Sequence, residues 1–357
     1  MTATITPPAL SRGDTIAFVS PSARLNDVFP LRITRAKDFL IAQGYDVRII
    51  SNEPVPKGYL AGVNHRVAEL HAAFVDPTIR AIVCTIGGNS ANELVPHLDY
   101  ELIASNPKIF VGYSDITLLH HALLFRASLR TFYGPAAITQ LGEVGGPLDF
   151  TWSHFLSVLQ NHPGSRPGAL PRSKTWTQDF RDWFDETPTS AEPRTLQPNR
   201  RSWTWLRKGQ AQGRLLGGCL PSLVQLTGTP FTFPAAEWKG RILLLELPEG
   251  GDAPATPHPL AYARSNLIDL ANAGILAAIA GVVVGRPYSY TKEMWDAWED
   301  TLMEVFEVYG MPVLANVDFG HTDPILTLPL DAMVRLDSAV DVFEVLEPTV
   351  SSRKDVE

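Results

Sequence analysis

The chain has 357 residues, of which 45% are hydrophobic and 19% charged, and its formal net charge at pH 7 is -8. A chain of this length can form two hydrophobic cores, because a single core seldom grows beyond ~250–300 residues. The composition is that of a folded protein. The acidic balance argues against nucleic acid or an anionic membrane as a partner, since both require a basic surface.

Cys84 and Cys219 are far apart in apolar surroundings, without the close spacing of a zinc site or a redox motif. They are interpreted as two buried thiols in a reducing compartment. Residues 1–12 lack the pattern of a signal peptide, and the apolar stretch 273–284 is too short to cross a bilayer. We therefore expect a cytoplasmic protein with no membrane partner.

Strand-like and helix-like segments alternate in the first part of the chain. Apolar runs typical of strands cover 15–19, 45–50, 81–86, 108–112 and 129–133, and helical spacing of apolar residues covers 31–43, 65–74 and 116–126. This alternation predicts a parallel sheet with helices on both faces, as in Rossmann or flavodoxin-like folds, over residues 1–145. In such sheets the functional groups gather at the carboxyl ends of the strands.

The alternation stops after residue 145. Residues 146–212 include a stretch rich in proline and arginine and are expected to form a linker and a tryptophan-bearing loop. Residues 213–357 are expected to form a smaller mixed α/β domain with a β-rich core. Its predicted strands are 242–245, 279–284 and a closing hairpin of 334–336 with 342–345, and its predicted helices are 220–227, 260–271 and 292–309.

Ser114 follows the apolar run 108–112 and precedes a helical segment. A serine on such a turn projects its hydroxyl beyond the sheet, and the helix N-terminus favours developing negative charge. Serine is also a good helix N-cap, so the local pattern is compatible with either a nucleophile or a cap. Position 116 is isoleucine rather than the glycine of the α/β-hydrolase elbow, which argues against that superfamily.

Gly87 and Gly88 end the preceding apolar strand. Paired glycines let backbone N–H groups approach a ligand closely, as an oxyanion site requires, although a simple tight turn has the same pattern. No lysine or third spaced glycine follows, so the pair is not a phosphate-binding loop.

Glu246 ends a buried apolar run, where a carboxylate is costly unless it is paired. Glu249 and Asp252 follow closely and are alternative candidates for a functional acid. His321 lies in a polar loop between two apolar runs, in a setting that also suits an ordinary turn residue. The adjacent His120 and His121 fall within the helix after Ser114 and are interpreted as structural.

The ordered set of these motifs resembles the LD-carboxypeptidase family of serine peptidases along most of the chain. The segments that carry the resemblance are Gly13-Asp14-Thr15-Ile16, Ser20-Pro21-Ser22, Gly87-Gly88, Gly112-Tyr113-Ser114-Asp115, Gly134-Pro135, Gly217-Gly218-Cys219-Leu220, the strand ending at Glu246, Gly281-Val282-Val283-Val284-Gly285 and Gly320-His321. Leu247-Pro248 departs from the commoner family pattern, in which an acidic residue often follows the catalytic glutamate.

The resemblance implies a Ser–Glu–His triad of Ser114, Glu246 and His321, with an oxyanion hole formed by the backbone amides of Gly88 and Asp115. It implies amide hydrolysis through an acyl-enzyme, with no metal or cofactor. It also implies a homodimer. Ser114 would then come from the first domain and both of its partners from the second, which predicts a site between the two domains.

Two branches of the family are distinguished by substrate. Murein LD-carboxypeptidases remove the terminal D-alanine of cell-wall tetrapeptides, whereas the microcin-immunity branch hydrolyses an amide that joins an aminoacyl group to a nucleotide-like moiety. The second branch has a longer tryptophan-bearing loop, which favours it here. Trp183 is the predicted substrate contact, through stacking on a base, and Trp203 and Trp205 are expected to anchor the loop.

The sequence also bears on two other classes of function. A non-catalytic protein that binds a small peptide or nucleotide in the same cleft is compatible with the motifs. A dinucleotide-dependent oxidoreductase is disfavoured, because the first strand-to-helix turn at 19–23 lacks the glycine fingerprint.

Overall fold

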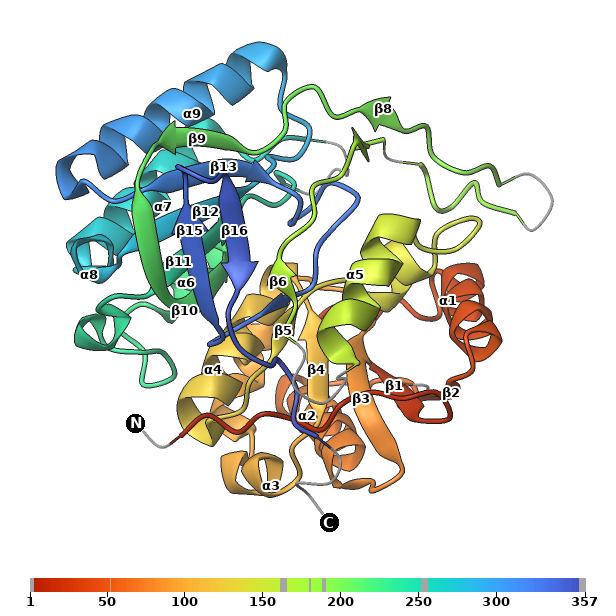
Figure 1. Ribbon diagram of the computed structural model, residues 1–357. Coiled ribbons are helices and arrows are strands. Elements are labelled where there is room, and N and C mark those ends of the chain that lie inside the picture. Colours follow the sequence, from red (N-terminus) through yellow and green to blue (C-terminus); the bar gives the residue numbers. More distant parts are fainter. Residues whose placement is uncertain are drawn as a thin grey trace.

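The computed structural model of the chain describes residues 3–51, 53–160, 166–179, 181–187, 191–251 and 256–352. Within these ranges the strands form a six-stranded sheet, an eight-stranded sheet and a two-stranded ribbon (Figure 1). Helices pack on both large sheets, which confirms the predicted α/β architecture with a parallel sheet in the N-terminal part and a mixed sheet in the C-terminal part.

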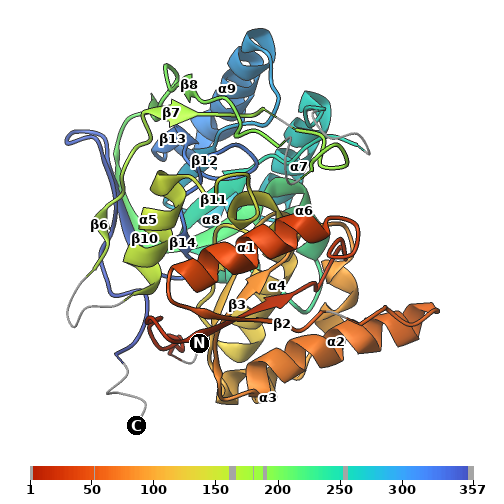
Figure 2. The ribbon, with the colours of Figure 1, turned by 90° about the vertical axis from the view of Figure 1, so that its right-hand side faces the viewer.

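The first sheet has the parallel order β2-β1-β3-β4-β5, which is the order of flavodoxin-like folds. Its strands are β1 (Thr15–Val19), β2 (Asp46–Ile49), β3 (Ile79–Cys84), β4 (Ile109–Gly112) and β5 (Phe132–Tyr133). Helices α1 (Pro30–Ala42) and α5 (Asp149–Leu159) cover one face, and α2 (Tyr59–Val75), α3 (Tyr100–Ser105) and α4 (Thr117–Ala127) cover the other (Figure 2). Burial on both faces explains why the inner strands β1, β3 and β4 are mostly apolar, whereas the edge strand β2 carries Asp46 and Arg48 and is more exposed.

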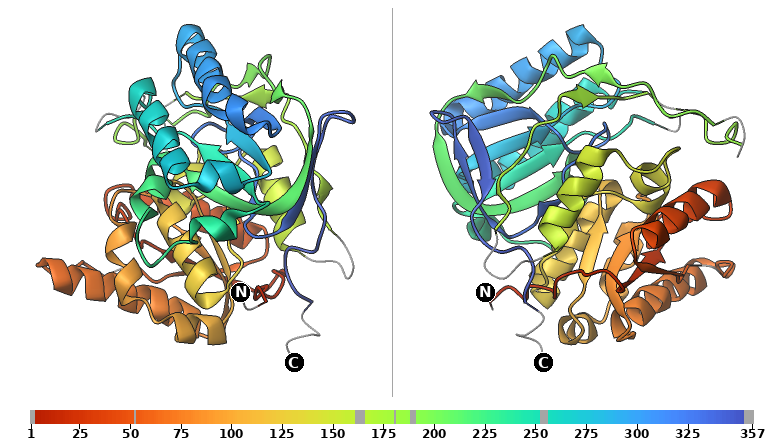
Figure 3. Two further views of the ribbon diagram at one scale, coloured as in Figure 1. Left: turned by 90° about the vertical axis from the view of Figure 1, so that its left-hand side faces the viewer. Right: turned by 45° about the vertical axis from the view of Figure 1, so that its right-hand side comes forward.

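The second sheet has the order β6-β16-β15-β10-β11-β12-β13-β9, with a parallel centre and antiparallel flanks. Its strands are β6 (Gly168–Ala169), β9 (Thr204–Arg207), β10 (Gln210–Cys219), β11 (Ile242–Glu246), β12 (Gly281–Gly285), β13 (Val313–Val317), β15 (Met333–Asp337) and β16 (Val342–Val345). Helices α6 (Leu220–Leu226), α7 (Leu260–Asn272), α8 (Ile275–Ala278) and α9 (Lys292–Phe306) cover one face (Figure 3, left). The hairpin expected near the C-terminus is confirmed as β15–β16.

The two halves of the chain are interlocked. The short strand β14 (Leu328–Pro329) pairs antiparallel with β5, so the C-terminal half supplies the edge of the first sheet. The two ends of the chain also meet, because Pro8 forms a bridge with Ser351, and both termini lie on the same side of the molecule (Figure 1). These connections fix the first sheet relative to the second.

The segment 146–212 contains more structure than its sequence indicated. Its first part forms α5, which packs on the first sheet, and strands β7 (Thr175–Trp176) and β8 (Gln197–Pro198) pair further along. As expected, Trp203 and Trp205 anchor the segment: their indole N–H groups donate to Asp318 at 2.6 Å and Asp341 at 2.8 Å. Among the described residues, the helices are too short or too polar to pass through a lipid bilayer.

Candidate active site

Ser114 lies at the carboxyl end of β4, where the chain turns through a single 3₁₀ turn into α4. Its φ angle is +62°, a left-handed conformation that costs energy for any residue with a side chain. Gly87 permits this turn, because a Cβ at position 87 would lie 2.8 Å from Ser114 Cβ. The strand end and the neighbouring glycine thus present the serine hydroxyl at the edge of the sheet.

A chain of hydrogen bonds links Ser114 to residues of the second sheet. His321 Nε2 lies 3.0 Å from Ser114 Oγ, and His321 Nδ1 lies 2.7 Å from Glu246 Oε2. Glu246 is the last residue of β11, and His321 lies in the loop after β13. The structure therefore brings together three predicted residues that are 75 to 207 positions apart in the sequence.

The Glu246 carboxylate is fully buried and both of its oxygens have partners. Its second oxygen, Oε1, accepts a 2.6 Å hydrogen bond from the Tyr133 hydroxyl, which in turn accepts one of 3.0 Å from the Ser114 amide. Burial, followed by the nearby Glu246 charge, raises the pKa of Tyr133, so the phenol keeps its proton. Sequence reasoning missed Tyr133, because a tyrosine at the end of an apolar strand resembles any other core residue.

Glu249 approaches the other side of the histidine. Its Oε2 lies 3.3 Å from His321 Nε2, so Glu249 shares this nitrogen with Ser114 and does not replace Glu246 at Nδ1. Asp252, the other alternative acid, lies outside the described residues. Burial alone lowers the pKa of His321, but the charges of Glu246 and then Glu249 raise it to about 9. The ring is therefore an imidazolium cation in the free protein near neutral pH.

Gly88 and Asp115 flank the serine on the side of the first sheet. Gly88 has a φ of +145°, and a Cβ there would lie 2.6 Å from Ser22 Oγ, so only glycine fits. Among the described residues, neither the Gly88 nor the Asp115 amide N–H has a hydrogen-bond acceptor. Both donors are thus available to a ligand beside Ser114.

The Asp115 side chain holds the glycine loop in place. Its carboxylate accepts hydrogen bonds from Ser22 Oγ at 2.5 Å and from the backbone amides of Ser90 at 3.0 Å and Ala91 at 2.9 Å. Burial raises the pKa of Asp115, an effect that these hydrogen bonds oppose. The contacts tie the segment after Gly88 to the residue next to Ser114.

A cavity of about 630 Å³ opens at this site and extends away from it. Gly87, Gly88, Ser114, Glu249 and His321 line it. Apolar and aromatic side chains also line it, namely Leu25, Val28, Phe29, Trp183 and Phe184, together with charged residues such as Arg181 and Asp182. The cavity therefore combines the reactive groups with aromatic surface that suits a flat group.

Trp183 lines this cavity but is already packed against α1 and the loop before it. Its ring lies edge-on to Phe29 with centroids 5.1 Å apart, and the Arg32 guanidinium lies 4.4 Å from the ring centre. The nearby Arg194 joins Glu143 and Asp323, each at 2.7 Å, and so connects the tryptophan-bearing segment to the loop of His321. Part of the Trp183 indole surface thus holds the tryptophan-bearing segment against α1.

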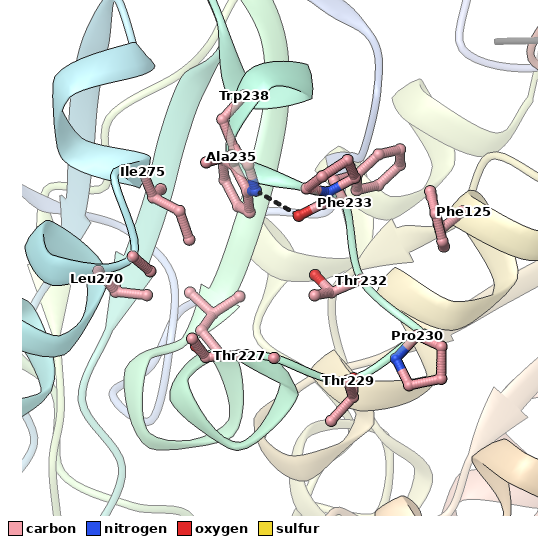
Figure 4. Close-up of a pocket in the computed structure, with 14 residues that line it drawn as sticks. Phe125, Thr227, Thr229, Pro230, Thr232, Phe233, Ala235, Trp238, Leu270 and Ile275 are labelled. Atoms are coloured by element: carbon pink, nitrogen blue, oxygen red, sulfur yellow. Dashed lines mark hydrogen bonds between the residues drawn. The ribbon is translucent and has the colours of Figure 1, made fainter.

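A second cavity of about 500 Å³ lies between α4, the loop after α6 and α7 (Figure 4). Apolar side chains such as Phe125, Phe233, Trp238 and Ile275 line it, and the Trp238 indole donates to the Phe233 carbonyl at 3.3 Å. No ionisable side chain is among the described residues that line it. The groups able to perform acid–base chemistry lie around the first cavity.

His120 and His121 are buried, and within the described part of the chain neither forms a hydrogen bond with Ser114, Glu246 or His321. His120 contacts the Gly112 carbonyl at 2.9 Å and Thr131 Oγ1 at 2.9 Å, and His121 contacts the Gly217 carbonyl at 3.2 Å. Burial lowers the pKa of His120 to about 4 and that of His121 to about 3. Both are neutral residues that tie α4 to its surroundings, as interpreted from the sequence.

Curated relatives and solved structures match this chain over almost its whole length. A Vibrio cholerae protein named provisionally as a carboxypeptidase is 32% identical over 97% of this chain and 98% of its own. The microcin C7 self-immunity protein MccF of Escherichia coli is 29% identical over 97% and 96%. A Bacillus subtilis protein named provisionally as a murein peptide carboxypeptidase is 29% identical over 97% and 95%.

The solved structure of MccF in complex with glutamyl sulfamoyl guanosine has a TM-score of 0.86 and 26% identity, covering 97% of this chain and 99% of that one. That of MccF with aspartyl sulfamoyl adenosine also has 26% identity, with a TM-score of 0.85 and coverage of 97% and 100%. The LD-carboxypeptidase N-terminal domain matches residues 16–134, and the LD-carboxypeptidase C-terminal domain matches residues 212–336. The chain belongs to the LD-carboxypeptidase family and is a serine-type carboxypeptidase.

Proposed function

We propose that this enzyme hydrolyses the amide bond of an aminoacyl-nucleotide-like substrate through an acyl-enzyme on Ser114. The observation that carries the proposal is the hydrogen-bonded series Ser114–His321–Glu246 beside a cavity. A serine hydroxyl is a weak nucleophile unless a base accepts its proton, and a base held by a buried carboxylate is the arrangement that serine hydrolases use.

Each residue then has one role. The neutral form of His321 accepts the Ser114 proton through Nε2 as the hydroxyl oxygen attacks the acyl carbon, and it later returns that proton to the leaving amine. Glu246 fixes the ring through Nδ1 and stabilises the imidazolium that forms. The Gly88 and Asp115 amides donate to the tetrahedral oxyanion, each contributing roughly 3–4 kcal/mol as in comparable sites. Water then hydrolyses the acyl-enzyme.

The lining of the cavity supports the choice of substrate. An acyl group at Ser114 leaves the rest of the substrate in the cavity that Trp183 also lines, where the indole would contact a nucleobase. Stacking of a base on an aromatic ring contributes roughly 1–3 kcal/mol. The solved MccF complexes contain aminoacyl sulfamoyl nucleosides, which are ligands of this kind.

Hydrolysis of a murein tetrapeptide is the second candidate, favoured by the likeness to the murein peptide carboxypeptidase named above. An assay of wild type and Ser114→Ala on an aminoacyl-sulfamoyl adenosine and on a tetrapeptide ending in D-alanine distinguishes the two. Serine-dependent cleavage of the nucleoside compound supports our proposal, and cleavage of the tetrapeptide alone contradicts it. Tight binding without turnover by wild type would instead indicate a non-catalytic binding protein.

We also propose that the enzyme acts in the cytoplasm as a homodimer. Both cysteines are free and buried, which suits a reducing compartment. Burial raises the pKa of both thiols, so neither is poised to react. Sedimentation of the purified protein over a range of concentrations tests the dimer, and fractionation of the cells tests the compartment.

A further inference from the structure

Glu249 is the acidic residue of the cavity whose carboxylate lies against Nε2 of His321, and no other cationic side chain of the described residues pairs with it. The other acidic residues have different partners: Glu143 and Asp323 are paired with Arg194, Asp179 is 3.3 Å from Arg181, and Asp182 accepts the Phe184 amide at 2.9 Å. The Glu249 side chain is 48% exposed, so its carboxylate is open to the cavity. A bridge between Glu249 and Pro257 holds its backbone just beyond β11.

In the free protein this carboxylate opposes the use of His321 as a base. The Ser114 hydroxyl and the Glu249 carboxylate both lie against Nε2, at 3.0 and 3.3 Å, and the carboxylate favours a proton on that nitrogen. The other charged or titratable groups around the ring are Glu246 at Nδ1, Asp323 (already paired with Arg194), His258 and the Tyr113 ring at 5.0 Å. Compensation of the Glu249 charge when substrate binds would therefore favour loss of the Nε2 proton and the use of His321 as a base.

The proposed substrate carries a positive charge at a suitable place. In an aminoacyl compound the α-ammonium group is two bonds from the acyl carbon that Ser114 attacks. Glu249 Oε2 and Ser114 Oγ contact the same imidazole nitrogen, so the carboxylate lies next to the point of attack. When the acyl residue belongs to a longer peptide, its α-nitrogen is a neutral amide and cannot provide this charge.

We propose that the Glu249 carboxylate binds the α-ammonium group of the acyl residue, so that the enzyme selects substrates with a free amino terminus and releases His321 to act as the base when they bind. This inference rests on the proposed function. Glu249 is then a specificity-determining residue. An α-acylated substrate has no positive charge at this nitrogen, so the Glu249 carboxylate continues to favour a proton on His321.

Two substrates that differ only at the α-nitrogen test this selection. We expect wild type to prefer an aminoacyl-sulfamoyl adenosine over its Nα-acetylated form by roughly ten- to a hundredfold in kcat/KM, the range for a hydrogen bond between charged groups. Glu249→Gln should lose most of this preference. Glu304→Gln removes one negative charge from an exposed position on α9, remote from the cavity, and should retain it.

The outcomes separate this inference from the proposed function. An unchanged preference in Glu249→Gln, with serine-dependent cleavage intact, overturns the role of Glu249 alone. If wild type cleaves neither compound, the role of Glu249 can still be tested by binding. Calorimetry then measures the binding of both compounds to Ser114→Ala and to Ser114→Ala/Glu249→Gln. A binding preference for the free amine that disappears with Glu249 supports the inference, whereas equal binding of both compounds, or binding of neither, overturns it.

Discussion

The Tyr133 hydroxyl donates a 2.6 Å hydrogen bond to Oε1 of Glu246, a carboxylate with no exposure to solvent. The same hydroxyl oxygen accepts the Ser114 amide at 3.0 Å. Tyr133 ends β5 of the first sheet and Glu246 ends β11 of the second. The Tyr133 hydroxyl therefore connects Glu246, at the end of a strand of the second sheet, to the strained turn at Ser114, which follows a strand of the first sheet.

Replacing Tyr133 with phenylalanine should lower kcat more than it alters KM. The change leaves one oxygen of a buried carboxylate and one backbone amide without partners, which should destabilise the protein by ~1–3 kcal/mol. Misplacement of the serine and the imidazole should reduce kcat by roughly ten- to a hundredfold. Steady-state kinetics and denaturant unfolding measure the two effects.

Tyr100→Phe is the matched control, because the Tyr100 hydroxyl donates to the Val95 carbonyl at 2.6 Å and lies outside the active-site cavity. It should lower stability while leaving kcat unchanged. Equal kcat values for Tyr133→Phe and wild type would show that the phenol is structural.

Thr117 supplies a second connection between the sheets. Its hydroxyl donates to the Ser114 carbonyl at 2.7 Å and accepts the Cys219 amide, at the end of β10, at 3.0 Å. Gly218 permits this approach, since a Cβ there would lie 2.4 Å from Thr117 Oγ1. Thr117→Val keeps the shape and removes both hydrogen bonds, so kcat should fall by roughly ten- to a hundredfold.

Thr117→Ser retains the hydroxyl and should restore kcat, which a role in packing alone would not predict. If valine and serine variants have the same kcat, measured at saturating substrate, the hydroxyl does not position the serine turn.

The sequence could predict the site residues that lie at the ends of predicted strands. Ser114 and Glu246 each follow an apolar run, and parallel strands bring their carboxyl ends to one edge. His321 has no such local signal and was identified through the family resemblance. Tyr133 and the position of Glu249 depend on how the two sheets pack, which local patterns do not encode.

The fold likewise contains features that local sequence patterns predict and features that depend on residues far apart in the chain. The parallel order of the first sheet follows from the strand–helix alternation, whereas its edge strand β14 arrives from almost 200 residues further along the chain. Helix α5 was overlooked, although Phe155, Val158 and Leu159 have helical spacing. The expected strand at 129–133 is reduced to Phe132–Tyr133, because Ser128 is left-handed and Leu129 pairs with Ile5 instead.

The kcat/KM of hydrolysis should rise with pH as His321 loses its proton. In the proposed mechanism the free enzyme must lose the His321 proton before His321 can accept one from Ser114, and the pKa of His321 is raised to about 9. The acidic limb of kcat/KM reports this group in the free enzyme. Because the Glu249 charge contributes to the raised pKa, Glu249→Gln should move the limb to lower pH. A limb that does not move in a pH series from 6 to 10 would show that Glu249 leaves the histidine unperturbed.

The stability of the protein should fall as pH rises through the same range. The pKa of His321 is raised from an ordinary value of 6.5 to about 9 in the folded protein, so the folded state binds the proton more tightly than the unfolded state does. This stabilisation is complete below pH ~6.5 and is lost as pH passes ~9. A shift of this size corresponds to roughly 3 kcal/mol.

Urea unfolding of wild type and His321→Asn at pH 6 and pH 10 measures the effect. Groups outside the His321–Glu246–Glu249 cluster titrate alike in both proteins, so the difference between their pH dependences reports this cluster. Wild type should lose more stability between these pH values than the variant. Parallel losses would mean that the imidazolium gains nothing from Glu246 and Glu249 on folding, and the rise of activity with pH would then need another titrating group.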